Sequence, residues 1–251
     1  MIIGLFHKGS GVGNQLFRYV MTRVIAEDKG FDFGMIGEFK GDSFIQIHKG
    51  KDVELDYYTQ MPEGRIVVKP SFYDFFMEDC SDYDWSIRDI KDNTIIDGEF
   101  QGELYFQHRL EDIKDWLKVE PLDMPDDVCV LAFRGGEYVG LKDLFLPKEY
   151  WDLAISKMKA INPNMRFEVH TDDEVTAKQF FPDYKVIHNV GINWRSMRFA
   201  KYVVLSNSSF GILPALLNDN AEKIYAPKNW LRRNVGVQFL KYNVYDKFEA
   251  I

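Results

Sequence analysis

The sequence predicts an α/β protein in which parallel strands alternate with helices. Short apolar runs typical of buried strands alternate along the chain with stretches whose apolar residues recur at helical spacing. Polar and glycine-rich clusters directly follow several of these strands. Ligands of open parallel sheets bind beyond the carboxyl ends of the strands. The sequence therefore predicts a ligand site along those ends.

The length and one linker candidate predict two domains. A chain of 251 residues is long enough for one large domain or for two of about 120 residues each. The segment 120–127 contains two prolines and four acidic residues, a composition typical of a linker. We therefore expect an N-terminal domain over residues 1–122 and a C-terminal domain over residues 123–251.

Composition excludes several classes of function. A formal net charge of −8 argues against bulk attraction to nucleic acid or to an anionic membrane. The two cysteines, Cys80 and Cys129, form neither a metal-ligand set nor a disulfide framework. No stretch approaches the roughly 18 apolar residues of a transmembrane helix, and the start lacks the features of a signal peptide. These observations predict a cytoplasmic protein without a transmembrane segment.

In the first half, the apolar run 1–6 predicts a buried strand. A helix follows, because Leu16, Val20, Val24 and Ile25 share one helical face. Further strands are expected at 66–68 and 94–98. Apolar residues at helical spacing between positions 104 and 117 predict a second helix.

In the second half, strands and helices alternate more cleanly. Pro147 suits the first turn of a helix over 147–160, and Thr171 or an aspartate can cap a helix over 172–180. A short helix is expected over 194–200. Strands are expected at 128–133, 166–170, 184–187, 202–205 and 223–225.

The first polar cluster, residues 10–17, lies between the first strand and the first helix. Its glycines allow a close approach of backbone N–H groups to a ligand, and the helix N-terminus favours anions. The spacing matches neither a dinucleotide-binding fingerprint nor a P-loop. A tight turn is the alternative interpretation. Asn14 and Gln15 can cap the helix or bind the edge of a sugar or nucleotide.

The second cluster, Arg134 to Tyr138, follows the strand at 128–133. A charged arginine at the end of a buried strand needs an anionic partner. One interpretation is a salt bridge to one of the 39 acidic residues. The other is a phosphate, which the forked guanidinium suits better than a lysine does.

The third cluster, residues 206–211, follows the strand at 202–205. Hydroxyl and N–H groups at a strand-to-helix turn can form an anion-binding nest. An ordinary helix N-cap is the alternative interpretation.

Six segments, in order, resemble motifs of the α1,2-fucosyltransferase family and of the wider fucosyltransferase superfamily. Residues 11–19 resemble G-x-G-N-Q-L-F-Q-Y, and residues 98–106 resemble G-Y-F-Q-s-x-x-Y-F. Residues 132–138 resemble H-x-R-R-G-D-Y. The other matches are Thr171-Asp172-Asp173 to S/T-D-D, residues 197–210 to M-s-x-C-k-x-x-I-x-x-N-S-S-F, and residues 226–230 to a-P-k-x-W.

The third motif departs from the family pattern at three positions. Ala132 stands in place of the motif histidine, Gly135 in place of the second arginine, and Glu137 in place of the aspartate. In the superfamily that histidine approaches the nucleotide, so Ala132 leaves the donor open. The arginine most closely tied to catalysis remains as Arg134.

The resemblance implies a GT-B-like α/β fold, with two Rossmann-like domains facing a cleft. The C-terminal domain would bind a nucleotide sugar, which the resemblance implies is GDP-fucose, and the N-terminal domain would present the glycan acceptor. It implies an inverting glycosyltransferase that needs no cofactor and no metal. Asp82-Tyr83-Asp84 matches D-x-D in letters only, because it lies in a mixed polar stretch.

The resemblance also suggests roles for single residues. Arg134 would stabilise the departing diphosphate, aided by Ser208, Ser209 and Phe210. Asp172 would accept hydrogen bonds from guanine. Gly13 and Asn14 would lie near the diphosphate or the transferred sugar.

The base that deprotonates the acceptor stays open. Glu137 is a candidate, although a neighbouring guanidinium weakens a carboxylate as a base. His7 and His170 also end strands, where a histidine is more often structural. Two alternatives remain: a different nucleotide-sugar donor, or a binding module that recognises a nucleotide sugar or glycan without turnover.

Overall fold

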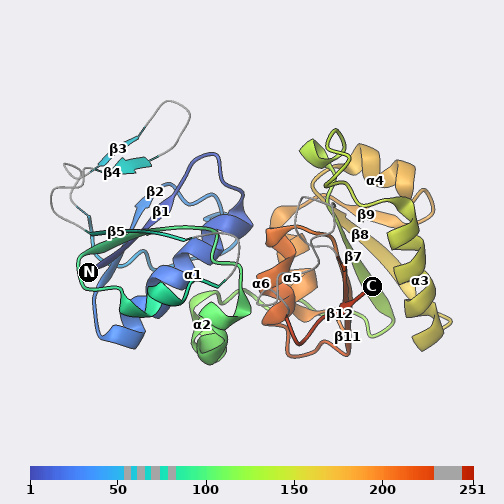
Figure 1. Ribbon diagram of the computed structural model, residues 1–251. Coiled ribbons are helices and arrows are strands. Elements are labelled where there is room, and N and C mark those ends of the chain that lie inside the picture. Colours follow the sequence, from blue (N-terminus) through green and yellow to red (C-terminus); the bar gives the residue numbers. More distant parts are fainter. Residues whose placement is uncertain (54–57, 61–65, 69–73, 79–82, 229–244) are drawn as a thin grey trace. The chain divides into compact units, whose positions relative to one another are not determined.

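The computed structural model describes residues 1–53, 58–60, 66–68, 74–78, 83–228 and 245–251 (Figure 1). These residues fall into two compact units, one of residues 1–118 and one that begins at Val119. Each unit contains a sheet of parallel strands with accompanying helices. The predicted α/β class is therefore confirmed. Cys80, Asp82 and the end of the last motif, Asn229-Trp230, lie outside the described residues.

The first unit contains a four-stranded sheet with the order β2-β1-β6-β5. All three pairings within it are parallel. Its longest helix, α1, packs against β1 and buries the predicted apolar face. The elements are β1 (Ile2–Phe6), α1 (Val12–Lys29), β2 (Phe33–Gly37), β3 (Tyr58–Gln60), β4 (Ile66–Val68), β5 (Asp74–Met77), β6 (Thr94–Asp97) and α2 (Leu110–Trp116).

Two expected elements of this unit differ from the structure. The strand at 66–68 forms, but as β4 it pairs antiparallel with β3 in a separate hairpin. The helix expected over 104–117 is only α2, preceded by short 3₁₀ turns. Phe106 interrupts it with φ −141° and ψ 0°, a conformation outside the helical region. Phe106 is fully buried, and its ring centroid lies 5.8 Å from that of Phe17.

The second unit contains a six-stranded parallel sheet with the order β12-β11-β10-β7-β8-β9. Figure 1 shows α3 and α4 on one face of this sheet and α5 and α6 on the other. The elements are β7 (Val128–Phe133), α3 (Lys148–Ile161), β8 (Arg166–Thr171), α4 (Glu174–Phe180), β9 (Lys185–Ile187), α5 (Val190–Phe199), β10 (Tyr202–Leu205), α6 (Ser209–Leu216), β11 (Lys223–Ala226) and β12 (Glu249–Ala250).

Local capping explains two helix starts in this unit. The Asp173 side chain accepts a hydrogen bond from the Thr176 N–H and caps α4. The Asn189 side chain accepts from the Ile192 N–H, so α5 begins before the expected residue 194. An asparagine three residues before an apolar helical position was the available signal.

Aromatic side chains form much of the core of the second unit. The ring centroid of Phe133 lies 5.3 to 5.9 Å from those of four other rings, Phe145, Trp151, Phe180 and Phe181. Cys129, on β7, is a buried free thiol of the same core, and burial raises its pKa. Part of the aromatic content of the sequence, 15% of its residues, therefore serves packing.

Glu168 on β8 makes the stability of this unit dependent on pH in the acid range. The nearby His170 imidazole, with 3.7 Å between Nε2 and Oε2, and the Lys185 ammonium, 2.9 Å away, lower the pKa of Glu168 to about 2 against the opposing effect of burial. A carboxyl with a lowered pKa stabilises the fold above the unfolded-state value of 4.5, and this contribution is lost as the pH falls through the folded value.

We expect Glu168→Gln to reduce the free energy of unfolding by about 1 kcal/mol at pH 7. The reduction should shrink between pH 4.5 and pH 2, because the wild-type carboxyl itself becomes neutral there. Urea unfolding at several pH values measures this. An equal loss at pH 7 and at pH 2.5 would contradict it.

No helix among the described residues is both long enough and apolar enough to span a bilayer.

Candidate functional site

The six segments singled out in the sequence all place polar or glycine residues at the carboxyl end of a parallel strand; the segment 197–210 begins in α5 and reaches such an end only after β10. Two of these strands, β1 and β6, are neighbours in the first unit. The other four are neighbours in the second unit, in the order β11-β10-β7-β8. Because parallel strands end at the same edge, the segments of each unit gather along one edge of its sheet.

The second sheet reverses its strand order between β7 and β10. From β7 the chain passes through α3 to β8 on one side, and from β10 it passes through α6 to β11 on the other side. Open α/β sheets bind ligands at such a switch point. Arg134 follows β7 directly, and the segment 206–210 follows β10, so both border the switch point.

Arg134 is held by two carboxylates of its own unit. Its Nη2 pairs with Glu137, and its Nη1 lies 2.6 Å from Asp172 Oδ2. The guanidinium carbon lies 5.0 Å from the centroid of the Tyr138 ring, and Nε is buried without a hydrogen-bond partner. Of the two alternatives for Arg134, the structure shows the salt bridge. The predicted residues Arg134, Glu137 and Asp172 therefore lie together.

The Arg-Gly-Gly turn contacts the two aspartates that follow β8. The Gly135 N–H donates to Asp172 Oδ1 at 2.9 Å, and the Gly136 N–H donates to Asp173 Oδ2 at 3.2 Å. A Cβ atom at Gly135 would lie 2.6 Å from the Asp173 Cβ. Glycine therefore replaces the second arginine of the motif where any larger residue would displace this contact.

The second aspartate, Asp173, has a structural role. Asp173 accepts hydrogen bonds from the side chain and backbone of Thr176 and from the Gly136 N–H, and these bonds lower its pKa. Asp172 holds Gly135 and Arg134 with its two oxygens. The assignment of Asp172 to a guanine edge stays a prediction, and guanine would have to bind in place of one of these contacts.

We expect Gly136→Ala to lower the free energy of unfolding by about 1 to 2 kcal/mol, since Gly136 has φ +51°. Its added Cβ would also lie 2.7 Å from Asp172 Oδ2. Gly140→Ala is the matched control, because a Cβ there meets nothing within 4 Å. Thermal unfolding of both variants tests this, and equal melting temperatures would contradict it.

The segment after β10 is a helix start that holds a neighbouring loop. Asn207 is buried, and its Nδ2 donates to the Leu144 carbonyl at 2.9 Å, while its Oδ1 has no hydrogen-bond partner. Ser208 occupies the N-cap position of α6 but makes no capping hydrogen bond with its side chain. Ser209 and Phe210 form the first turn, which contains no acidic residue. This turn suits an anion, because helix N-termini favour negative charge.

In the first unit, the amide pair of the first motif has two separate roles. Gln15 is fully buried; its Nε2 donates to the Glu38 carbonyl at 3.0 Å, and its Oε1 accepts from the Lys40 N–H at 2.9 Å. Gln15 thus fixes the loop after β2. Asn14 instead accepts a hydrogen bond from Gln101 at 3.2 Å, beside the buried Gly13.

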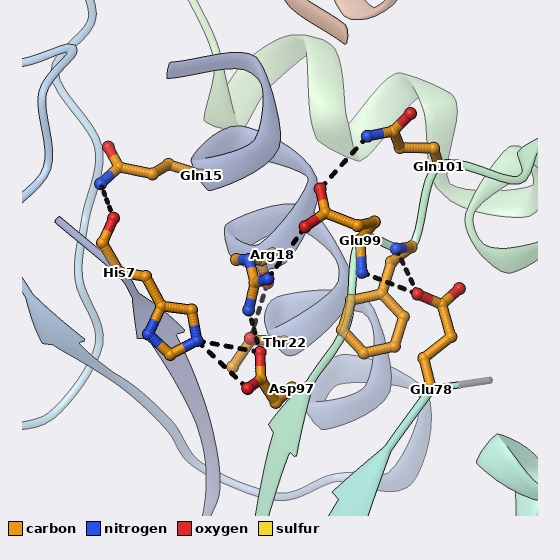
Figure 2. Close-up of polar contacts among 9 residues, drawn as sticks. His7, Gln15, Arg18, Thr22, Glu78, Asp97, Glu99 and Gln101 are labelled. Carbon is orange, nitrogen blue, oxygen red and sulfur yellow. Dashed lines mark hydrogen bonds and ion pairs between the residues drawn. The ribbon is translucent and has the colours of Figure 1, made fainter. Parts of the chain in front are cut away.

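An ionic cluster lies between the ends of β1 and β6 (Figure 2). We call His7, Arg18, Asp97 and Glu99 the first-unit cluster. His7 Nε2 lies 3.1 Å from each Asp97 oxygen, and Arg18 pairs with Asp97 through Nη1 and with Glu99 through Nη2 at 3.2 Å. Burial opposes ionisation of Asp97, but the His7 hydrogen bond and the Arg18 charge outweigh it and lower its pKa.

A buried acid shapes the turn that carries Glu99. Glu78 accepts hydrogen bonds from the N–H groups of Glu99 at 2.7 Å and Phe100 at 2.8 Å, and Phe100 has φ +48°. A Cβ at Gly98 would lie 2.5 Å from the Glu78 Cβ, so the motif glycine is needed for this close approach. Desolvation raises the pKa of Glu78.

Sequence reasoning did not find Arg18, Asp97 and Glu99. A signal was present, because Arg18 and Glu99 stand where the two resembled motifs have glutamine and tyrosine. The structure shows that these two residues pair with each other. Asp97, as the last residue of β6, lay at a strand end like the other site residues.

His170, the other histidine that was expected at the end of a strand, makes structural contacts. His170 is buried, and its Nδ1 lies 3.0 Å from Asn193 Oδ1. Asn193 in turn donates to the Thr171 carbonyl at 3.0 Å, which links α5 to the end of β8. Within the described parts of the chain, no group of three or more His, Cys, Asp or Glu side chains is arranged to hold a metal ion.

Comparison with known proteins finds glycosyltransferases among solved structures. No protein-family model matches the sequence, and no curated protein matches it. An α-1,6-fucosyltransferase, NodZ, co-crystallised with GDP is 15% identical, with a TM-score of 0.46 over 91% of this chain and 94% of that chain. Fucosyltransferase NodZ from Bradyrhizobium has a TM-score of 0.45 and 15% identity, over 89% and 92%. The E. coli heptosyltransferase WaaC with ADP has a TM-score of 0.44 and 14% identity, over 91% and 87%.

Proposed function

We propose that the chain is a nucleotide-sugar-dependent glycosyltransferase. In its most specific form, the proposal is an inverting, metal-independent transfer of fucose from GDP-fucose to a glycan hydroxyl, as in an α1,2-fucosyltransferase. The second unit would bind the donor, and the first unit would present the acceptor. One observation carries the proposal: each of the six motif-like segments includes the carboxyl end of a parallel strand or the turn that follows it, four of them on adjacent strands around a switch point.

The second-unit switch point offers groups that suit a diphosphate. A sugar–phosphate bond breaks more easily when a preorganised cation stabilises the charge on the leaving group. Arg134 is such a cation, and its ion pair with Asp172 fixes the orientation of the guanidinium. Glu137 is 64% exposed, so a phosphate can replace this carboxylate at little cost, because exposed ion pairs contribute at most about 1 kcal/mol. The first turn of α6 adds N–H groups.

Two alternatives differ in donor or in turnover. A different nucleotide sugar is favoured by Ala132, which lacks the imidazole of the resembled motif. A module that binds a nucleotide sugar or glycan without reaction is favoured by the engagement of Arg134 with two protein carboxylates.

Calorimetric titration of the full chain with GDP, UDP and CMP separates the donor alternatives. We expect GDP to bind most tightly. A clear preference for UDP would reject fucose as the donor sugar. Incubation with GDP-fucose and a set of galactoside acceptors then tests turnover through GDP release. Binding without release over the whole acceptor set would favour the inert module.

Glu137→Gln tests the exchange of a carboxylate for a phosphate. We expect GDP to bind several-fold more tightly to this variant, about 1 kcal/mol in free energy, because the ligand no longer competes with Glu137 for Arg134. Calorimetry gives the affinity, and GDP release gives the turnover. Unchanged affinity with abolished turnover would instead assign Glu137 as the catalytic base.

A further inference from the structure

The first-unit cluster lies at the carboxyl ends of the two central strands of its sheet. In the order β2-β1-β6-β5, the parallel strands β1 and β6 are neighbours, with β2 and β5 outside them. His7 is the residue after β1, and Asp97 is the last residue of β6. The two side chains therefore meet at the edge where open α/β sheets bind ligands.

The contact between them fixes the tautomer of the imidazole. Asp97 is ionised at neutral pH, since its pKa is lowered, and a carboxylate can only accept hydrogen bonds. His7 Nε2, 3.1 Å from both carboxylate oxygens, must therefore be the protonated nitrogen. In the neutral ring this leaves the lone pair on Nδ1, the nitrogen of the ring that does not contact Asp97 in Figure 2.

Arg18 holds Asp97 in place from the helix side. The guanidinium bridges Asp97 and Glu99, and Glu99 receives a further hydrogen bond from Gln101 at 3.3 Å. The Thr22 hydroxyl donates to the Arg18 carbonyl at 2.7 Å. The carboxylate behind the imidazole is thus clamped by residues of α1 and of the turn after β6, as preorganised catalysis requires.

Three members of the cluster are largely buried. The exposed fraction of the side chain is 8% for Arg18, 17% for Asp97 and 15% for His7. All three are thus largely shielded from water, which strengthens their interactions, and the imidazole is as accessible to solvent as the carboxylate that it contacts. Glu137, by contrast, is an exposed carboxylate paired with Arg134.

We propose that His7 is the general base of the transfer reaction and that Asp97 orients it. This inference rests on the proposed glycosyltransferase function. The His7 Nδ1 takes the proton of the acceptor hydroxyl while the acceptor oxygen forms a bond to the anomeric carbon of the donor sugar. The bond between that carbon and the phosphate oxygen breaks, and its electron pair leaves with the nucleoside diphosphate. Asp97 stabilises the imidazolium, which then loses its proton to solvent.

The decisive variant is His7→Gln. A glutamine amide can still donate a hydrogen bond to Asp97 but has no basic nitrogen. We expect the melting temperature and the calorimetric affinity for GDP to stay as in the wild type. The turnover number with GDP-fucose and a galactoside acceptor should fall about 100-fold, the usual contribution of a general base.

His7→Ala adds a test by chemical rescue. Added imidazole should raise the turnover number of this variant at least about tenfold, because a free base can occupy the space of the missing ring. His108→Gln is the matched control. His108 also contacts an aspartate, Asp28 at 2.7 Å, but at the far end of α1, and its loss should leave turnover unchanged.

The outcomes separate this inference from the function on which it rests. Wild-type turnover in His7→Gln overturns the base assignment and leaves the glycosyltransferase proposal intact. A folded, inactive His7→Ala that imidazole does not rescue also overturns it, because the role of His7 is then structural. A wild-type chain that releases no GDP with any acceptor overturns the proposed function itself, and the base with it.

Discussion

Arg134→Ala is expected to lower the turnover number of the transfer reaction by about 10² to 10³-fold, or about 3 to 4 kcal/mol in activation free energy. The leaving diphosphate gains charge in the transition state, and Arg134 is the cation that follows β7 at the switch point. Arg134→Lys should recover only part of the rate, because a lysine lacks the planar fork that pairs with two oxygens.

Arg166→Ala is the matched control. Arg166 also forms a bidentate ion pair, with Asp127 at 2.7 Å. This pair lies where β8 begins, at the end of the strand away from the candidate site. We expect this variant to keep its activity within a few-fold. Circular dichroism of both variants checks that they fold. If folded Arg134→Ala retained the wild-type turnover, the phosphate role of Arg134 would be wrong.

Arg18→Met is expected to lower the free energy of unfolding by about 3 kcal/mol at pH 7, because it leaves the Asp97 carboxylate largely buried without its cation. In the wild type, the lowered pKa of Asp97 means that its ionised form stabilises the fold at neutral pH and that this contribution is lost when acid protonates it. The difference between variant and wild type should therefore shrink on acidification. Urea unfolding at several pH values measures it.

The double variant Arg18→Met/Asp97→Asn isolates the charge effect. Replacing both partners removes the uncompensated charge, so much of the lost stability should return. Lys51→Met serves as a control in the same unit. Its ion pair with Asp32 is exposed and should contribute less than about 1 kcal/mol. A double variant as unstable as the single one would show that Arg18 stabilises the helix by packing and not by charge.

Local sequence predicted most of the elements. The spacing of apolar residues located α1, Pro147 marked the start of α3, and short apolar runs located β1, β6, β7, β8, β10 and β11. The clearest failure was the helix expected over 104–117, because periodicity does not reveal that the burial of Phe106 takes the backbone out of the helical region. The antiparallel pairing of β4 was missed for a similar reason, since a strand pattern does not name its partner.

The same distinction between local sequence and tertiary structure holds for the candidate site. The sequence alone determined that Asn14, Arg134, Asp172 and Ser208 follow strands, because strand ends and turn residues are encoded in contiguous positions. Only the tertiary structure decided which charges meet. Arg18 and Asp97 are 79 positions apart, and Arg134 reaches Asp172 because β7 and β8 are neighbours in the sheet. Such pairs depend on strand order and on burial, which are properties of the whole chain and not of any local segment.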